Sequence, residues 1–199
     1  MAKNGKLYES DFEEALVDLF EEVGWEYSHG DTISRKFTDP LIEKDLRDYL
    51  TCRYSTKHLS QDEMDGIVAN VRNASGQNEY YALQNTFYLY RDGYDYIPAE
   101  GSPFKLEYID FECPERNILR CVNQFVMEQG SENRRPDVML FVNGIPVCII
   151  ELKNPTKVDA TVYDAHTQIC TRYMRDIANL IKYCVLAIIS EAAKTVMGS

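Results

Sequence analysis

Residues 136–153 have the sequence PDVMLFVNGIPVCIIELK, and this stretch decides the fold of the chain. Two apolar runs, 138–142 and 145–150, flank an Asn143-Gly144 pair, which is typical of a tight turn between antiparallel strands. Both runs are apolar at successive positions rather than at alternate ones, so both faces of each strand are expected to be buried. The stretch therefore predicts a central hairpin in a sheet that helices cover on both sides.

Charged residues stand at one end of this predicted hairpin. Asp137 precedes the first apolar run, and Glu151 and Lys153 follow the second. Two neighbouring carboxylates form a good site for Mg²⁺, a hard cation that prefers oxygen ligands, and an ammonium group beside them steadies an attacking hydroxide or a scissile phosphate. This combination suits metal-dependent hydrolysis of phosphodiesters. The plainer alternative is that the carboxylates are solvated strand ends, because short patterns match by chance.

The three side chains meet only if they share one face of the sheet. Residues an even number apart on a strand share a face, so the side chains of Glu151 and Lys153 point to the same face. A two-residue turn at 143–144 places Asp137 and Glu151 on opposite faces, whereas a three-residue loop places them on the same face. The metal site therefore requires an odd-length loop or a bulge, and Pro146, which has no N–H, fits such an irregular strand start.

Length and composition indicate an ordinary globular protein. The chain has 199 residues, of which 45% are hydrophobic and 27% charged, enough for one or two domains with a substantial core. No run is long enough to span a membrane, and the N-terminus has no secretory signal. The six cysteines are scattered without CxxC spacing, which predicts free thiols in a reducing cytoplasm and argues against a zinc site.

Charge is distributed unevenly along the chain. The net charge is −11, but residues 1–130 hold 13 basic and 25 acidic residues, whereas residues 131–199 hold 8 and 7. The acidity therefore lies outside the candidate site. The chain still lacks the basic footprint of a protein that binds DNA strongly by itself. We infer that other chains or domains supply most of any DNA affinity.

Hydrophobic periodicity predicts the remaining elements. A capping-box pattern, Ser60-Gln-Asp-Glu63, begins one of the helices. The segment 130–135 is expected to be a polar loop. The predicted helices are 9–23, 40–53, 60–72, 159–175 and a short one at 177–183, and the segment 79–92 is predicted to be helical or mixed. The predicted strands beside the hairpin are 104–111, 119–127 and 184–190. This order gives a mixed α/β fold, a central mixed sheet flanked by helices.

The second half of the chain resembles one known family. The matching segments are Asp110-Phe-Glu-Cys-Pro-Glu115-Arg-Asn117, Val122-Asn-Gln124, Arg134-Arg-Pro-Asp137-Val, Val142-Asn-Gly-Ile-Pro-Val, Ile150-Glu-Leu-Lys-Asn-Pro155, Gln168-Ile169, Arg172-Tyr173 and Ile188-Ile189-Ser190. Together they resemble the N-terminal nuclease domain of the restriction (R) subunit of type I restriction–modification enzymes. A looser match extends to the start through Phe12-Glu13 and 24–27.

The resemblance implies a PD-(D/E)XK nuclease core, the restriction-endonuclease-like fold. Asp137, Glu151 and Lys153 carry over as the catalytic residues: the two carboxylates would bind Mg²⁺, and the lysine would orient water or stabilise charge at phosphorus. Glu13 is implied as the helix carboxylate that often joins such sites. Gln168 matches a glutamine that follows the site on a helix and either touches DNA or positions the catalytic groups.

One departure from the family pattern concerns that glutamine. The family commonly spaces it four residues from a tyrosine, which puts both on one helix face. Here Gln168 and Tyr173 are five apart, so a regular helix at 3.6 residues per turn separates them by about 140°. Either a π-bulge restores the pairing or Tyr173 packs in the core, and the core position is favoured. A second departure, Ser190-Glu191-Ala192 in place of Ser-Asp-Gly, lies away from the site.

The resemblance also implies a larger assembly. Residues 1–199 are expected to form a single nuclease domain, with a mainly helical part at 1–93 and a sheet-rich catalytic core at 94–199. The family's R subunit continues into an ATP-driven DNA translocase, so the chain is expected to be a fragment of a longer polypeptide. The implied partners are double-stranded DNA and the methylation (M) and specificity (S) subunits, in a bacterial or archaeal cytoplasm.

Two other functions stay open at this point. One is a non-catalytic module of the same fold that docks DNA or the motor, with the cutting centre elsewhere. The other is a different PD-(D/E)XK nuclease, such as a repair or recombination exonuclease. The carboxylates at a buried strand end argue against the docking module, and the residues around Asn143-Gly144 and Asn154-Pro155 favour the restriction family.

Overall fold

The computed structural model of the chain describes residues 9–153, 168–190 and 195–198. Its helices are α1 Glu9–Glu22, α2 Glu43–Arg53, α3 Gln61–Arg72, α4 Glu79–Asp92, α6 Met174–Asp176 and α7 Ala178–Ile181, with a π-helix at Gln168–Tyr173. Its strands are β1 Glu26–His29, β2 Tyr94–Tyr96, β3 Phe104–Leu106, β4 Leu119–Asn123, β5 Met127–Gln129, β6 Glu132–Arg134, β7 Val138–Val142, β8 Ile145–Leu152, β9 Leu186–Ser190 and β10 Thr195–Gly198.

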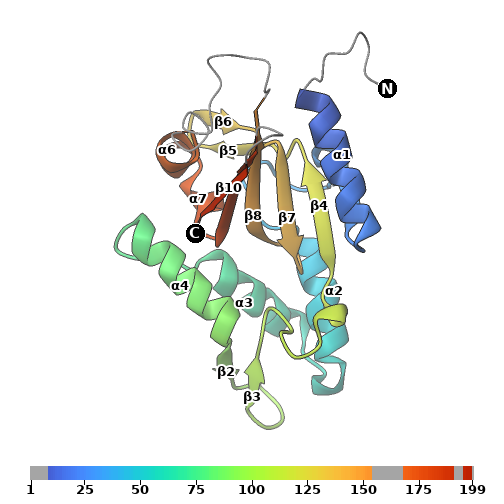
Figure 1. Ribbon diagram of the computed structural model, residues 1–199. Helices are drawn as coiled ribbons and strands as arrows, with labels where there is room; N and C mark the ends of the chain where they lie inside the picture. The colour runs from blue at the N-terminus through green and yellow to red at the C-terminus, as the bar shows by residue number, and fades with distance from the viewer. Residues whose placement is uncertain (1–8, 154–167, 191–194, 199) are drawn as a thin grey trace.

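A mixed sheet forms the centre of the molecule (Figure 1). Among the described residues its six strands have the order β1-β4-β7-β8-β9-β10. The pairs β1–β4 and β8–β9 are parallel, and the other neighbours are antiparallel. The predicted hairpin is the pair β7–β8 at the middle of this order. This arrangement confirms the predicted fold class and fits a restriction-endonuclease-like fold.

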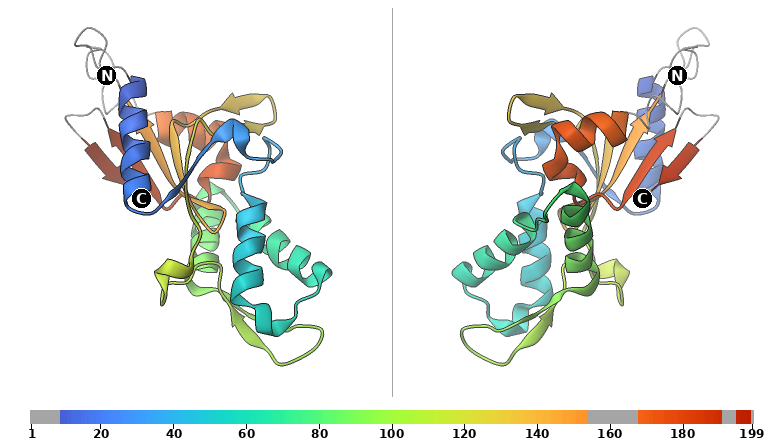
Figure 2. Two further views of the ribbon diagram at one scale, coloured as in Figure 1. Left: turned by 90° about the vertical axis from the view of Figure 1, so that its right-hand side faces the viewer. Right: turned by 90° about the vertical axis from the view of Figure 1, so that its left-hand side faces the viewer.

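Helices cover both faces of the sheet. The apolar stripe of α1 packs Val17 against alternate residues of β7 and β8, including Val138 and Ile150. On the opposite face, Met139 and Ile149 pack with residues of the π-helix, α6 and α7. Figure 2 shows α1, in blue, and the orange helices on opposite sides of the sheet. The hairpin is apolar on both faces because each face has its own core.

A helical lobe, residues 43–106, lies beyond the end of the sheet that carries the β7–β8 turn (Figures 1 and 2). It consists of α2, α3, α4 and the small β2–β3 sheet. Its core joins the sheet through Ile145, which packs with Leu46 and Ile67. The hydroxyl of Tyr90 also donates a 2.9 Å hydrogen bond to the carbonyl of Tyr183. The lobe therefore supports the turn, and the opposite end of the hairpin remains apart from it.

Several predicted elements are confirmed and others are wrong. The capping box at Ser60 and Glu63 is present. Helices α1, α2 and α3 lie within the predicted helices, and α4 forms the segment predicted to be helical or mixed. The predicted strand 104–111 ends at Leu106, and the strand predicted for 119–127 ends at Asn123. The polar loop predicted at 130–135 instead contains β6, which forms a small hairpin with β5 around Gly130. Its polar side chains are partly exposed, so hydrophobic patterning did not mark it.

The predicted division at residue 93 stays a prediction, and packing crosses it in both directions. Helix α1 and strand β1 come from the part predicted to be helical but pack on the sheet, whereas β2 and β3 adjoin the helical lobe. Residues 154–167 of the helix predicted at 159–175 lie outside the described residues. Among the described residues, no helix has the length and apolarity needed to cross a membrane, and the five cysteines described are free thiols.

Candidate active site

A two-residue turn and a bulge together set the geometry of the hairpin. Val142 pairs with Ile145, and the turn residues Asn143 and Gly144 have φ values of 51° and 75°. The register then shifts, because Phe141 pairs with Pro146 while Leu140 pairs with Cys148. The extra residue, Val147, forms a β-bulge that reverses the alternation of faces along β8. The structure thus meets the predicted requirement through the bulge, not through a three-residue loop.

Asn143 fixes the turn from inside the protein. Its side chain is fully buried. The amide nitrogen donates to the carbonyl of Tyr108 at 2.9 Å and to Oδ1 of Asn117 at 2.8 Å, and its oxygen accepts from the N–H of Ile118 at 2.7 Å. A buried amide with all these partners holds one conformation. The hairpin is therefore anchored at the end opposite the charged residues.

The bulge brings Asp137 and Glu151 to one face. Val138 pairs with Ile150, so the next positions outward, Asp137 and Glu151, stand opposite each other. Oδ2 of Asp137 accepts a 2.8 Å hydrogen bond from the N–H of Leu152. Nζ of Lys153 lies 3.6 Å from Oε2 of Glu151. The structure therefore gathers all three residues of the predicted triad at the end of the sheet away from the helical lobe.

Glu151 is held in an unusual electrostatic environment. Its side chain is 2% exposed. Burial, with the charge of Asp137 adding to it, raises the pKa of Glu151 to about 7, while hydrogen bonds from Tyr173 and the nearby Lys153 act in the opposite direction. A buried carboxyl whose pKa is raised by burial and by a neighbouring acid is a frequent feature of functional sites.

Tyr173 contacts the site through its hydroxyl, which donates a 2.8 Å hydrogen bond to Oε1 of Glu151. The segment Gln168–Tyr173 is a π-helix, in which residues five apart are hydrogen-bonded neighbours along the backbone. Tyr173 is also buried in the core. The predicted core position of Tyr173 is therefore confirmed within a π-helix, and its pairing with Gln168 stays a prediction. The side chain of Gln168 lies outside what the structure describes, and its role stays a prediction.

Glu13 is joined to the site through neighbouring amides. Its Oε1 accepts from Nδ2 of Asn123 at 2.8 Å, and both carboxylate oxygens accept from Nε2 of Gln124, at 3.0 and 2.9 Å. The backbone N–H of Gln124 donates to the carbonyl of Asp137 at 2.9 Å. The connection from α1 to the backbone at Asp137 therefore runs through Gln124.

Gln124 has a strained backbone. Its φ of 55° is uncommon for a residue with a side chain and costs on the order of 1 kcal/mol or more. Gly30 makes this conformation possible by close approach, since a Cβ at Gly30 would lie 2.4 Å from the carbonyl oxygen of Gln124. Sequence reasoning gave Asn123 and Gln124 no role, although they stood among the segments that resemble the family.

An ion pair fastens α6 to β6 beside the site. Asp176, three residues after Tyr173, is 1% exposed, and its Oδ2 accepts from Nε of Arg134 at 2.8 Å and from Nη2 at 2.5 Å. Arg175 contacts the other oxygen at 2.6 Å. These hydrogen bonds lower the pKa of Asp176, that from Arg175 most of all. Charged hydrogen bonds of this kind are strong and directional, so the Arg134–Asp176 pair fixes the position of α6. Tyr173 directly precedes α6 and is therefore held in place with it.

The donor set fits Mg²⁺. Asp137 and Glu151 are hard oxygen donors, and their mutual repulsion, which helps to raise the pKa of Glu151, is relieved by a bound divalent cation. Within the described residues, no cluster of three or more His, Cys, Asp and Glu side chains is arranged for a metal. Mg²⁺ usually keeps several waters and takes only one or two carboxylates, so two protein carboxylates are sufficient.

Comparison with known proteins agrees with this geometry. The family model for the N terminus of the type I restriction enzyme R protein matches residues 6–199. The chain is 30% identical, over 97% of its length, to the type I restriction enzyme HindI endonuclease subunit of Haemophilus influenzae. It is 28% identical, over 94% of its length, to a Methanocaldococcus jannaschii protein that carries the provisional name of type I restriction enzyme MjaIXP endonuclease subunit.

The chain spans 19% of the length of each of these two relatives. The family match covers both the charged end of the β7–β8 hairpin and the helix that carries Glu13. The fold, the hairpin and the relatives lead to one conclusion: the chain belongs to the family of type I restriction enzyme R protein N-terminal domains.

Proposed function

We propose that the chain is a Mg²⁺-dependent DNA endonuclease domain that hydrolyses phosphodiester bonds of foreign, unmodified DNA. One observation carries the proposal. A bulge in β8 turns Glu151 to the same face as Asp137, with the ammonium of Lys153 3.6 Å from the Glu151 carboxylate. A regular strand would have separated the two acids. The bulge thus brings two carboxylates and an ammonium group together, the combination that suits metal-dependent hydrolysis of phosphodiesters.

Each residue of the site has a proposed role. Asp137 and Glu151 would hold Mg²⁺, which when bound offsets negative charge at the phosphate under attack. The Leu152 N–H, by its hydrogen bond, fixes the orientation of the Asp137 carboxylate. Lys153 would orient water or stabilise charge at phosphorus. Tyr173 orients Glu151, and Glu13 with Gln124 supports the backbone at Asp137.

The wider assembly is part of the proposal. The two relatives are named as endonuclease subunits of type I restriction enzymes, and the chain spans a fifth of their length. We propose that it acts on double-stranded DNA with M and S subunits, which supply recognition, and with an ATP-driven translocase in the same longer polypeptide. The chain's net charge of −11 supports this division, because an acidic domain needs partners to hold DNA.

The direct test is cleavage of supercoiled plasmid with Mg²⁺ or Mn²⁺ by the chain and, in parallel, by the full enzyme that contains it. Asp137→Ala and Lys153→Ala should abolish cutting while circular dichroism and thermal unfolding show a folded protein. Full cleavage by Asp137→Ala in the assembled enzyme would refute the proposal.

The docking module remains the competing function, because a buried Glu151 that accepts a hydrogen bond from Tyr173 and lies 3.6 Å from the Lys153 ammonium also suits a structural role. Metal binding separates the two. Isothermal calorimetry with Mn²⁺ should show binding by the wild type that is lost in Glu151→Ala, with Glu26→Ala, an exposed acid on β1, as the control. Equal binding by all three proteins would favour the docking module.

A further inference from the structure

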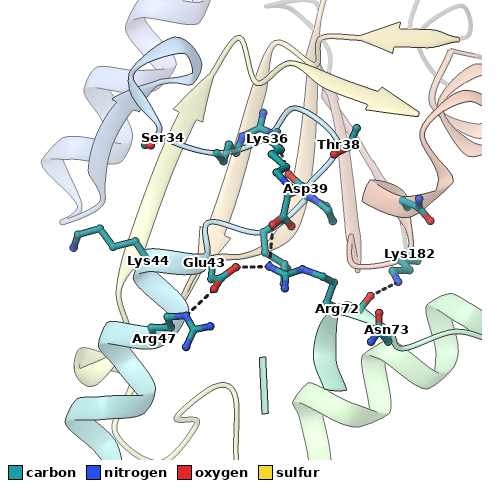
Figure 3. Close-up of a pocket in the computed structure, with 14 residues that line it drawn as sticks. Ser34, Lys36, Thr38, Asp39, Glu43, Lys44, Arg47, Arg72, Asn73 and Lys182 are labelled. Carbon is teal, nitrogen blue, oxygen red and sulfur yellow. Dashed lines mark hydrogen bonds and ion pairs between the residues drawn. The ribbon is translucent and has the colours of Figure 1, made fainter. Parts of the chain in front are cut away.

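A basic groove lies on the surface between the sheet and the helical lobe (Figure 3). Its volume is about 1010 Å³, and its walls come from the loop 34–41, the first turn of α2, the end of α3 and the end of α7. Six basic side chains line it: Arg35, Lys36, Lys44, Arg47, Arg72 and Lys182. Two acidic side chains, Asp39 and Glu43, also line it. A net positive groove on a chain of net charge −11 is a concentrated anion-attracting surface.

The two acids serve to position the arginines. Nη2 of Arg72 lies 2.9 Å from Oδ2 of Asp39 and 2.5 Å from Oε2 of Glu43. Nε of Arg47 lies 2.7 Å from Oε1 of Glu43. The hydrogen bond from Arg72 and the neighbouring Arg47 hold the pKa of Glu43 below its ordinary value. Both lining acids are therefore engaged within the protein. Outside the lining, Oδ2 of Asp48 lies 2.5 Å from Nζ of Lys44, and Oδ1 of Asp65 lies 2.6 Å from Nη2 of Arg47. Six basic side chains thus face four acids, and the groove keeps an excess of two positive charges.

Two buried donors lie behind the wall of the groove. Within the described part of the chain, three buried side-chain nitrogen or oxygen atoms have no hydrogen-bond partner, and two of them are Nε of Arg35 and Nη1 of Arg47. A buried N–H without a partner costs on the order of 1–3 kcal/mol. Both atoms are covered by the protein, and the Arg35 guanidinium also donates to the backbone carbonyls of Lys36, Asp39 and Val126, so these arginines shape the groove wall and the exposed lysines are the side chains that meet a ligand.

The groove and the catalytic residues lie at opposite ends of the β7–β8 hairpin, since the N–H of Ile42, beside the groove, donates a 2.9 Å hydrogen bond to the carbonyl of Gly144 in the turn. Glu151 is two residues from Ile149, so both point to the face that packs against Tyr173, Ile181 and Ile42. The groove borders that face, because Lys182 follows Ile181 and the α2 start follows Ile42. That face is covered by the π-helix, α6 and α7, so a phosphate chain in the groove lies at the turn end of the sheet, away from the triad.

We propose that this groove binds the phosphate backbone of the DNA duplex at the end of the sheet opposite the cleavage site. The inference rests on the proposed function and adds the surface that holds the substrate. Figure 3 shows the cations spread around the groove from four separate segments, with Lys36 and Lys44 reaching outward. Such a distribution matches an extended polyanion better than a compact one, and phosphate contacts from Lys and Arg hold DNA without reading its sequence.

The experiment measures the affinity of the whole chain for a fluorescent DNA duplex by anisotropy, in EDTA so that no cutting occurs, at several salt concentrations. Lys36→Ala/Lys44→Ala is the test variant, since both side chains are exposed. Lys57→Ala/Lys105→Ala, also exposed and outside the groove, is the control of equal charge change. Lys36→Arg/Lys44→Arg keeps the charge and should bind as the wild type does.

The test variant should bind DNA about tenfold or more weakly at low salt, and its log–log salt slope should fall by about 2, since each phosphate contact contributes about 0.9. The control should keep the wild-type slope. Equal affinity and equal salt slope in the test and control variants would overturn the proposal. It would also be overturned if the wild type bound no duplex, or if tripolyphosphate at the same concentration as the duplex displaced the duplex from the protein.

Failure of the groove is distinguishable from failure of the catalytic assignment. Asp137→Ala should bind the duplex with the wild-type salt slope and cut no plasmid. Cleavage that survives Asp137→Ala would contradict the proposed catalytic function without changing the slope measured for the lysine variants. Unchanged DNA affinity in Lys36→Ala/Lys44→Ala would contradict the proposed DNA-binding role of the groove. A loss of cutting in Asp137→Ala would still support the catalytic assignment.

Discussion

The hydroxyl of Tyr173 donates a 2.8 Å hydrogen bond to Oε1 of Glu151, across 22 residues of sequence and inside the core. This bond favours the ionised carboxylate, because it is among the contacts that lower the pKa of Glu151. A tyrosine on the π-helix thus affects how readily the site carries negative charge.

Tyr173→Phe should therefore raise the pKa of Glu151 further. The pH dependence of cleavage should move to higher pH, and the rate at pH 7 should fall several-fold, with about 1 kcal/mol lost from the free energy of unfolding. Tyr183→Phe is the matched control, since the Tyr183 hydroxyl donates to backbone carbonyls of Val71 and Arg72 at 3.1 Å and is equally buried. Identical pH profiles for the two variants would contradict the role of Tyr173.

Glu151 itself should make the metal-free protein less stable at high pH. Its pKa is raised from the ordinary 4.5 to about 7, so between these values the folded state holds a proton that the unfolded state has released. Stability from this group is highest below about pH 4.5 and falls as the pH rises to 7.

Glu151→Gln should then be more stable than the wild type at pH 8, by on the order of 2–3 kcal/mol. The difference should shrink as the pH falls from 7 towards 4.5. Urea unfolding at several pH values in EDTA measures it, and added Mg²⁺ should restore the wild type selectively. A pH-independent difference would show that the pKa of Glu151 is not raised.

Gly144→Ala should disturb the hairpin. The φ of Gly144 is 75°, and a Cβ there would lie 2.2 Å from the carbonyl oxygen of Ile42. The left-handed conformation alone costs about 1 kcal/mol with a side chain, and the contact with backbone adds to it. We expect a loss of at least about 2 kcal/mol in urea unfolding.

Gly66→Ala is the matched substitution. Gly66 lies within α3, and a Cβ there meets nothing within 4 Å. Alanine in a helix interior should stabilise the protein by about 0.5–1 kcal/mol. Equal effects of the two glycine variants would contradict the tight approach of α2 to the turn.

Glu13→Gln should weaken cleavage by about tenfold, a typical effect of losing one supporting contact near a site. The substitution replaces one acceptor oxygen by a donor, so the amides of Asn123 and Gln124 lose a partner. Glu14→Gln, an exposed neighbour in the same helical turn, should leave activity unchanged. Plasmid cleavage with Mg²⁺ measures both, and equal activity of the two variants would exclude Glu13 from the site.

The sequence predicted the sheet and its hairpin because residues 138–150 are apolar on both faces, a pattern that only a covered central strand satisfies. It also predicted the cap at Ser60, which depends on residues three apart. Strand β1 escaped prediction, since Glu26–His29 is short, polar and partly exposed. Its place at the edge is fixed by pairing with β4, a contact distant in the sequence.

The contacts around the predicted triad were harder to anticipate. The bulge depends on tertiary pairing, since the carbonyl of Val147 accepts a 3.0 Å hydrogen bond from the N–H of Val185. The bond between Gln124 and Glu13 joins residues 111 apart. Local periodicity carries no information on such pairs, because it reports faces of single elements and not their neighbours.

The bulge at Val147 also imposes a counting rule on this hairpin. Thirteen residues, 138–150, separate the two acids. A two-residue turn with one bulge and a three-residue loop without a bulge both place the two acids on one face with the same number of residues between them. The shape of the turn is therefore free to differ among relatives. Removing one residue between the acids would move Glu151 through the sheet to the side of α1, whereas removing two would return it. Insertions and deletions between the two acids should therefore be tolerated when they change the length of the hairpin by an even number of residues.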